Sequence, residues 1–224
     1  MKLFCIPYAG GSRFYFQKLK ETLPEAIECE LLDYAGHGSR IGEPLAGSFE
    51  ALIDDADRTI KRLCKQDEPF AVFGYSMGSL VAYQLAGRHS GQASHLFTAA
   101  FQPPNLLKEE KYTLNEDAWE NFVSKFTVLD HRILEDPRYR KIFLDPLKND
   151  FRLLCRYTPE RLESVDCDIT VMFGTRDVFG EEINGWRKYT KRSCEIVSFE
   201  GGHFFLQEYI KEIAGLIARK LLIQ

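Results

Sequence analysis

The chain lacks a long apolar run and a strong charge of either sign. Its 224 residues carry a formal net charge of −4, so we expect neither nucleic acid nor an anionic membrane as a bulk partner. No apolar stretch approaches the length of a membrane span. The apolar run at residues 3–6 is too short for the core of a secretion signal. These absences predict a cytoplasmic protein with no membrane segment.

Paired cysteine motifs, internal repeats and low-complexity tracts are also missing. The six cysteines are scattered, and none forms a Cys-x-x-Cys pair. Scattered cysteines without a secretion signal indicate reduced thiols. The length suits one domain with an insertion, and it is enough to bury a sizeable core without disulfides.

The first hundred residues alternate between strand and helix patterns. Strands are predicted over residues 3–7, 27–32, 70–74 and 94–100, with helices over 14–23, 48–64 and 79–87. The alternation resumes after residue 168, with strands over 169–174 and 194–199 and helices over 181–189 and 210–222. Such alternation predicts an α/β protein with a mainly parallel sheet and helices on both faces.

Residues 102–168 interrupt this pattern with no convincing strand. Large apolar residues and helical patches around 115–126 and 145–157 fill the segment after Pro103-Pro104. Its simplest interpretation is a helical lid inserted between a first core part, 1–101, and a second, 169–224. A helical subdomain with its own core is the alternative, and the two are compatible because a lid can leave a channel beneath it.

Gly74-Tyr75-Ser76-Met77-Gly78 lies between a predicted strand and a predicted helix. A Gly-x-Ser-x-Gly sequence in this context is the nucleophile elbow of serine hydrolases. The glycines are needed because a Cβ on either side would collide with the neighbouring strand and helix. The helix start directs free N–H groups and a positive dipole end toward an anion beside Ser76. A tight turn with a solvated serine is the alternative.

A serine nucleophile needs a base and an acid that orients the base. His203 follows the last predicted strand, where the order serine, aspartate, histidine places the base. His37 is the best rival, although a structural role in its loop suits it better. The acid is predicted at Asp177, just after the strand over 169–174. A turn cap is the alternative role for Asp177.

The other place for an acid is the end of the strand over 94–100, but Phe101-Gln102-Pro103-Pro104 contains no carboxylate. An oxyanion hole also needs two N–H donors. The residue after the nucleophile, Met77, supplies one. The loop 7–11 supplies the other, with the Ala9 amide favoured over those of Tyr8 and Gly10. Its two glycines fit neither a P-loop nor a dinucleotide-binding fingerprint.

Six segments resemble, in order and over nearly the whole chain, the type II thioesterases of nonribosomal peptide and polyketide synthesis, a branch of the α/β-hydrolases. They are Cys5–Ser12, Gly36–Arg40, Phe73–Ser79, Leu144–Phe151, Phe173–Asp177 and Phe199–Leu206. The resemblance implies an α/β-hydrolase fold with a helical lid. The sequence departs from the family pattern at two places. Tyr75 stands where the family often has His, and Gly36-His37-Gly38 stands where many members have a Pro-Gly-Arg type turn.

The same resemblance implies hydrolysis of acyl thioesters from the phosphopantetheine arm of acyl or peptidyl carrier proteins. It supports Ser76, Asp177 and His203 as the catalytic triad and the amides of Ala9 and Met77 as oxyanion donors. The chemistry requires no metal and no organic cofactor. Rival functions are a carboxylesterase or lipase acting on oxygen esters and a non-catalytic binding protein of the same fold.

The segment 138–161 contains seven cationic and three acidic side chains in a chain of net negative charge. Carrier domains of this class tend to be acidic, so the segment is a candidate docking face. A solvated helix face is the alternative. Because the chain begins at Met1 with no preceding module, we expect a freestanding enzyme rather than a macrocyclising terminal domain, and we expect a monomer.

Overall fold

The computed structural model describes residues 1–107, 140–159, 162–178 and 180–223. Its six strands form a single sheet in the order β2-β1-β3-β4-β5-β6, and all described pairings are parallel. The strands are β1 (Lys2–Ile6), β2 (Glu28–Leu31), β3 (Phe70–Tyr75), β4 (Ala93–Ala99), β5 (Asp168–Gly174) and β6 (Cys194–Phe199). The predicted strand bounds are confirmed to within one residue at each end.

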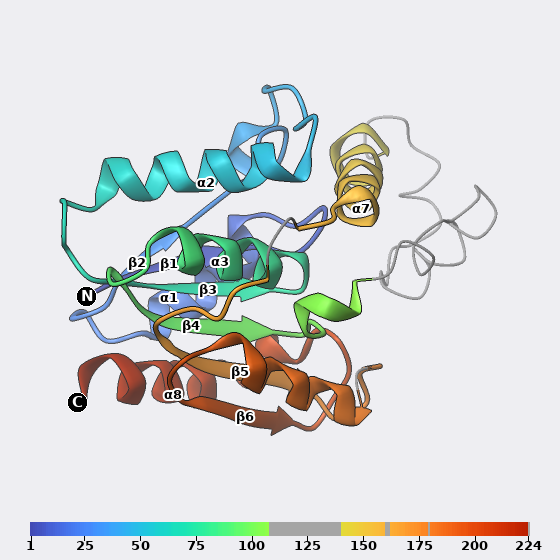
Figure 1. The fold of residues 1–224 in the computed structure, drawn as a ribbon. Coiled ribbons are helices and arrows are strands. Elements are labelled where there is room, and N and C mark those ends of the chain that lie inside the picture. Colours follow the sequence, from blue (N-terminus) through green and yellow to red (C-terminus); the bar gives the residue numbers. More distant parts are fainter. Residues whose placement is uncertain (108–139, 160–161, 179, 224) are drawn as a thin grey trace.

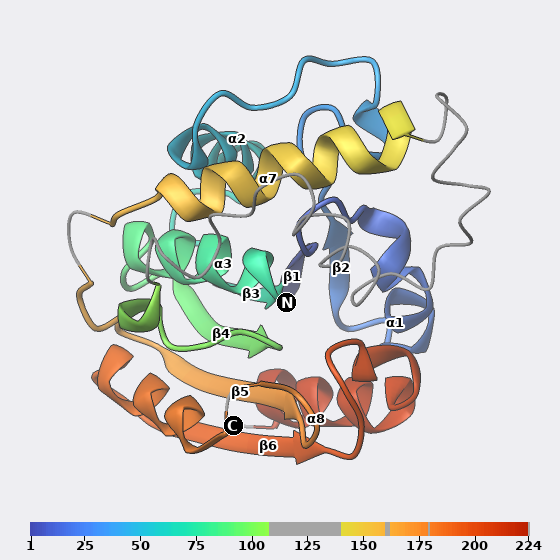
Figure 2. The ribbon, with the colours of Figure 1, turned by 90° about the vertical axis from the view of Figure 1, so that its right-hand side faces the viewer.

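Helices cover both faces of this sheet, as predicted (Figures 1 and 2). Helices α2 (Phe49–Leu63), α3 (Met77–Arg88) and α7 (Asp145–Arg156) lie over one face. Helices α1 (Gln17–Thr22) and α8 (Ile210–Leu222) lie over the other. The strand order reverses between β1 and β3, and in open α/β sheets ligands bind at the carboxyl ends of the strands at such a point.

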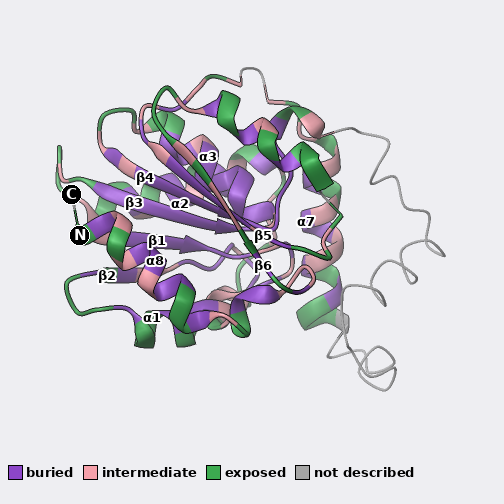
Figure 3. Cartoon of the chain, turned by 90° about the horizontal axis from the view of Figure 1, so that it is seen from below, coloured by how far each residue is buried: buried purple, intermediate pink, exposed green. Residues whose placement is uncertain are grey.

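The core consists of two layers because side chains alternate across the sheet. In β1, Phe4 and Ile6 face α2 and α3, whereas Leu3 and Cys5 face α1 and α8. Strand β3 is buried at all six positions (Figure 3). Parallel strands that are covered on both faces read as continuous apolar runs, which is why the sequence revealed them.

Two of the predicted helices take the tighter 3₁₀ form in part or throughout. The segment over 14–23 begins as the 3₁₀ helix η1 (Arg13–Phe16) and becomes α-helical only at Gln17, a common form for a helix start. The segment over 181–189 is the 3₁₀ helix η6 (Gly180–Tyr189) rather than an α-helix. Its glycines weaken α-helical preference, and a Cβ at Gly185 would lie 2.9 Å from Pro103 Cγ.

Only part of the predicted lid lies within the described residues. The expected patch at 115–126 is outside them, whereas the patch at 145–157 corresponds to helix α7. Helix α7 buries Leu153 and Leu154 in the core layer of α2 and α3. The assignment of 102–168 as a lid stays a prediction. In the described parts of the chain, no helix has the length and apolarity that a membrane span would need.

Candidate active site

Ser76, His203 and Asp177 meet at the carboxyl edge of the sheet. His203 Nε2 lies 3.1 Å from Ser76 Oγ, and His203 Nδ1 lies 2.9 Å from Asp177 Oδ2. The serine follows β3, the aspartate follows β5 and the histidine follows β6. The Asp177 side chain is only 4% exposed. The three residues singled out in the sequence are therefore joined by hydrogen bonds in the order that a nucleophile, its base and an orienting acid require.

The nucleophile elbow has the sharp geometry that its glycines permit. Ser76 has φ 52° and ψ −123°, between the end of β3 and the first turn of α3. A Cβ at Gly74 would lie 2.1 Å from the Gly78 carbonyl oxygen, and one at Gly78 would lie 2.3 Å from the Ile6 carbonyl oxygen. Neither position has room for a side chain. The predicted reason for both glycines is confirmed.

Ser79 ties the elbow to the neighbouring strand. Its hydroxyl donates to the Gly74 carbonyl (2.8 Å) and accepts from the Ala99 N–H (3.1 Å). The Ser76 N–H donates to the Ala99 carbonyl at 2.7 Å. Sequence reasoning missed this role of Ser79, although a small polar residue in the first turn of the helix was a signal for it.

Backbone hydrogen bonds join the loops that carry Asp177 and His203. The Arg176 N–H donates to the Gly201 carbonyl at 2.8 Å. A Cβ at Gly174 would lie 2.2 Å from the Gly202 carbonyl oxygen, so glycine at the end of β5 lets the two loops touch. This close approach brings the carboxylate within reach of the imidazole.

The loop after β1 lies beside the elbow because β1 and β3 are adjacent strands. The Gly10 N–H donates to Asp150 Oδ2 at 2.8 Å, so Gly10 is engaged and is no longer an alternative oxyanion donor. Within the described parts of the chain, the Ala9 amide donates no hydrogen bond. Met77 is the first residue of α3, so its N–H has no intrahelical acceptor. These amides are the two that the sequence favoured.

The remaining described histidines have partners elsewhere. The rival base, His37, contacts Asp150 and not Ser76: its Nε2 lies 3.0 Å from Asp150 Oδ2. His89 Nε2 contacts Asp57 at 2.7 Å. His95 contacts Thr170, and burial lowers its pKa to about 4. His131 lies outside the described residues.

Tyr75 connects the elbow to the base. Its hydroxyl donates to the His203 carbonyl oxygen at 2.5 Å, and its side chain is fully buried. Burial raises the pKa of Tyr75 well above its usual range, so the phenol remains a neutral donor at ordinary pH. The sequence marked Tyr75 only as a departure from a family pattern and did not reveal this contact.

The variant Tyr75→Phe is expected to lower kcat by about three- to tenfold with KM nearly unchanged, because the loop that holds His203 loses a fixing hydrogen bond. The matched control is Tyr83→Phe, since the Tyr83 hydroxyl donates to the Glu163 carbonyl at the same 2.5 Å on another part of the molecule. Steady-state kinetics on an activated ester checks this. Equal kcat in the two variants would contradict the role of Tyr75.

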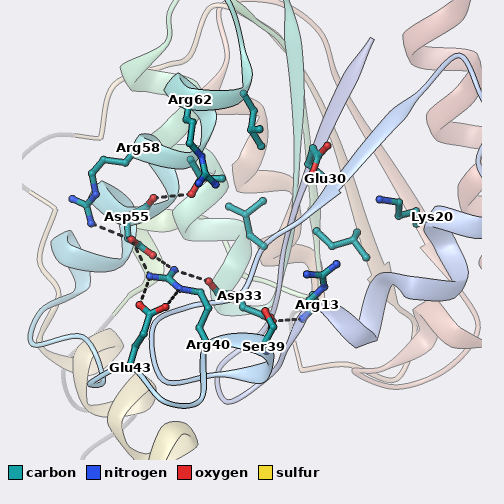
Figure 4. Close-up of a pocket in the computed structure, with 14 residues that line it drawn as sticks. Arg13, Lys20, Glu30, Asp33, Ser39, Arg40, Glu43, Asp55, Arg58 and Arg62 are labelled. Atoms are coloured by element: carbon teal, nitrogen blue, oxygen red, sulfur yellow. Dashed lines mark hydrogen bonds and ion pairs between the residues drawn. The ribbon is translucent and has the colours of Figure 1, made fainter.

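Two cavities in the described part of the chain are lined by none of Ser76, Asp177 and His203. A cavity of about 590 Å³ runs beside the edge strand β2 and helix α2, and its lining is mostly charged. There Arg40 is held between Glu43 and Asp55 (Figure 4). A cavity of about 340 Å³ lies between residues 36–45 and the start of α7. Neither cavity is lined by a residue of the Ser76, His203 and Asp177 set, so both are poor candidates for the reaction centre.

The reversed strand order and the elbow are those of the α/β-hydrolase fold, and the Ser-His-Asp hydrogen bonds have the arrangement of a serine hydrolase triad. The chain belongs to the thioesterase domain family, whose model matches residues 1–221. It is therefore a thioester hydrolase, and the resemblance seen in the sequence is confirmed.

Individual relatives agree with this family. Thioesterase PikA5 of Streptomyces venezuelae is 27% identical over 100% of this chain and 82% of its own length. Gramicidin S biosynthesis protein GrsT of Aneurinibacillus migulanus is 29% identical over 99% of this chain and 89% of its own. The solved structure of RedJ, a thioesterase from the prodiginine biosynthetic pathway in Streptomyces coelicolor, matches 98% of this chain and 85% of its own at 27% identity, with a TM-score of 0.84.

Proposed function

We propose that this thioesterase releases acyl groups from the phosphopantetheine arm of carrier proteins in nonribosomal peptide or polyketide synthesis, with Ser76, His203 and Asp177 as its catalytic triad. The observation that carries the proposal is the pair of contacts from His203 to Ser76 (3.1 Å) and to Asp177 (2.9 Å) in a chain of the thioesterase family. The biosynthetic roles in the names of GrsT and RedJ support the pathway.

The first half of the reaction transfers the acyl group to Ser76. The hydroxyl attacks the thioester carbonyl while His203 Nε2 takes its proton, because Nε2 is the ring nitrogen that faces Oγ. Asp177 accepts from the Nδ1–H, which fixes the tautomer and stabilises the imidazolium. The tetrahedral intermediate collapses with loss of the pantetheine sulfur, which takes the proton from His203. The products are an acyl-serine and a free thiol.

The second half returns the enzyme to its starting state. His203 takes a proton from water, the resulting hydroxide attacks the acyl-serine, and the released Ser76 oxygen regains a proton from the imidazolium. The oxyanion of both intermediates is stabilised by the amides of Ala9 and Met77. The absence of another hydrogen bond from the Ala9 amide among the described residues supports this role.

Helix α7 and the residues just before it are the candidate docking face for the carrier. Lys141, Arg152 and Arg156 are exposed there. Asp150 is fully buried, so it adds no negative charge to this surface, which favours an acidic partner. Arg138, Arg161 and the Arg140 side chain lie outside the described residues. We infer that the protein is cytoplasmic, which the free state of all six cysteines supports. We also infer that it is a monomer.

The proposal predicts a preference for thioesters presented by a carrier. One acyl group is compared on a carrier protein, on free pantetheine and on a matched oxygen alcohol. We expect kcat/KM to be highest for the carrier, by about tenfold over free pantetheine, and to fall with added salt only for the carrier, because docking between charged surfaces is screened.

The three rates also separate the rival functions. An oxygen ester hydrolysed as fast as the thioesters would indicate a carboxylesterase. Equal rates for the carrier and free pantetheine at every salt concentration would remove the docking proposal and leave the thioesterase. A protein that turns over none of the three and is not labelled by a fluorophosphonate would be a non-catalytic binding protein.

A further inference from the structure

A buried carboxylate on helix α7 reaches across to the loop after β1. Asp150 is 0% exposed, and its Oδ2 accepts from the Gly10 N–H at 2.8 Å. Its other oxygen, Oδ1, is buried and has no hydrogen-bond partner in the part of the chain that the structure describes. A buried carboxylate with an unmade hydrogen bond is costly unless a nearby positive charge compensates it.

His37 supplies that charge. Its Nδ1 lies 3.0 Å from the Ala35 carbonyl oxygen, which can only accept, so Nδ1 carries a proton. Its Nε2 lies 3.0 Å from Asp150 Oδ2. An unprotonated Nε2 would turn a lone pair toward a carboxylate, so a second proton is favoured there. Burial lowers the pKa of His37, but the nearby Asp150 carboxylate outweighs burial and the pKa is raised.

The loop that Asp150 holds is the one that carries a proposed oxyanion donor. Gly10 has φ +71°, and a Cβ there would lie 2.7 Å from Leu147 Cβ of the same helix. Asp150 therefore fixes the peptide group between Ala9 and Gly10, and Leu147 packs against the turn. The Ala9 N–H belongs to the preceding peptide group, between Tyr8 and Ala9. Its direction depends on the peptide group that Asp150 fixes, because the two groups are joined at the Ala9 Cα.

We propose that Asp150 and His37 form a buried ion pair that positions the oxyanion loop and so couples the placement of helix α7 to the rate of the chemical step. Both are positioning residues, since they act through Gly10 and Ala9 rather than on the substrate. The proposal rests on the hydrolase chemistry proposed for Ser76, but not on the identity of the leaving group or the carrier.

This ion pair makes the rate depend on pH. Other ionisable groups face His37 from its own loop. Asp33 is occupied by the Arg13 and Ser39 amides and the Ser39 hydroxyl. The Tyr34 ring lies edge-on to His37 at 5.6 Å, and burial followed by the charge of Asp150 raises the pKa of the Tyr34 phenol well above its usual value. Because the pKa of His37 is raised above its usual value, His37 keeps its second proton to higher pH than a free imidazole does, and the pair is lost as pH rises through that pKa.

The test uses Asp150→Ala and Asp150→Asn, with Asp57→Ala and Asp57→Asn as matched controls. Asp57 forms a second aspartate-histidine contact in the same chain, with His89 Nε2 at 2.7 Å, between α2 and the end of α3. Turnover of a p-nitrophenyl ester is measured from pH 5 to 10, and active sites are counted with a fluorophosphonate. A p-nitrophenyl ester serves whether or not carrier thioesters are the substrate.

We expect Asp150→Ala to lower kcat by about tenfold or more with KM within about twofold, because the amide direction matters most in the transition state. Asp150→Asn can keep an oxygen at the Oδ2 position for the Gly10 N–H and removes the charge that holds a second proton on His37, so it should fold and lose the decline of kcat at alkaline pH that the wild type shows. Asp57→Ala and Asp57→Asn should keep both the wild-type kcat and its pH profile.

Three results would overturn the proposal: a kcat for Asp150→Ala within twofold of wild type, an equal loss of kcat in Asp57→Ala, or a wild-type alkaline decline that persists in Asp150→Asn. Should Asp150→Ala fail to fold, the pH profile of Asp150→Asn decides. A wild-type protein that is neither active nor labelled would instead show that the proposed function itself has failed.

Discussion

Replacing Ser76 with alanine is expected to lower kcat for a thioester substrate by about 10⁴-fold or more, because no other described group is placed to attack a carbonyl beside His203. The fold should not change. The elbow is held by the backbone bond from the Ser76 N–H to Ala99 and by the Ser79 hydroxyl, neither of which needs the Ser76 side chain. Single-turnover kinetics and thermal unfolding measure the two effects separately.

The control for this variant is Ser94→Ala. Ser94 is near the start of β4, at the amino ends of the strands and away from Ser76. Its hydroxyl donates to the Phe70 carbonyl at 2.9 Å. That variant should keep its kcat and lose only about 1 kcal/mol of stability. A Ser76→Ala protein that retains more than a tenth of the wild-type kcat would contradict the assignment of the nucleophile.

The second large effect is expected in stability. Gly78→Ala should lower the free energy of unfolding by more than about 4 kcal/mol or prevent folding, because overlap with fixed backbone cannot be relieved by moving a side chain. The new Cβ would lie 2.3 Å from the Ile6 carbonyl oxygen and 2.5 Å from that of Pro7. Relief would require α3 and β1 to separate, which would also displace the oxyanion loop.

Gly87 provides the matched control in the same helix. A Cβ at Gly87 meets no atom within 4 Å, so Gly87→Ala should raise the free energy of unfolding by about 0.5–1 kcal/mol through its higher helix propensity. Urea unfolding of the three proteins gives the comparison. A Gly78→Ala protein within 1 kcal/mol of wild type would show that the elbow tolerates a side chain there.

The sheet could be predicted from the sequence because its strands are covered on both faces. Buried parallel strands appear as short apolar runs that end in glycine or turn residues, and Phe70-Ala71-Val72-Phe73 before Gly74 is one of these. Their parallel arrangement followed from the alternation with helices. The helix predicted over 181–189 is present, and its 3₁₀ form could not be predicted because the packing of Gly185 against Pro103 is a tertiary contact.

The site was predictable where a local motif marks the end of a strand. Ser76, Asp177 and His203 each follow such an end, and parallel strands bring these ends to one edge of the sheet. The absence of a carboxylate after β4 pointed to Asp177 without any knowledge of its distance to His203.

Contacts between distant residues without a motif could not be predicted. The bond from Gly10 to Asp150 joins residues 140 positions apart, and that from Tyr75 to His203 joins residues 128 apart. In the sequence, Asp150 was one acidic residue of a basic, family-like segment, and His37 was a rival base in a loop that departs from the family pattern. Nothing in the local pattern indicates that the two are buried against each other.

Covalent labelling can identify the nucleophilic residue of this enzyme. The protein is treated with a fluorophosphonate, and the modified residue is identified by peptide mass mapping, with labelling rates compared between wild type and His203→Ala. We expect a single label on Ser76 and a labelling rate at least about a hundredfold lower without His203, because that imidazole activates the hydroxyl. A label on another residue, or an unchanged rate in His203→Ala, would contradict the assignment of Ser76 and His203.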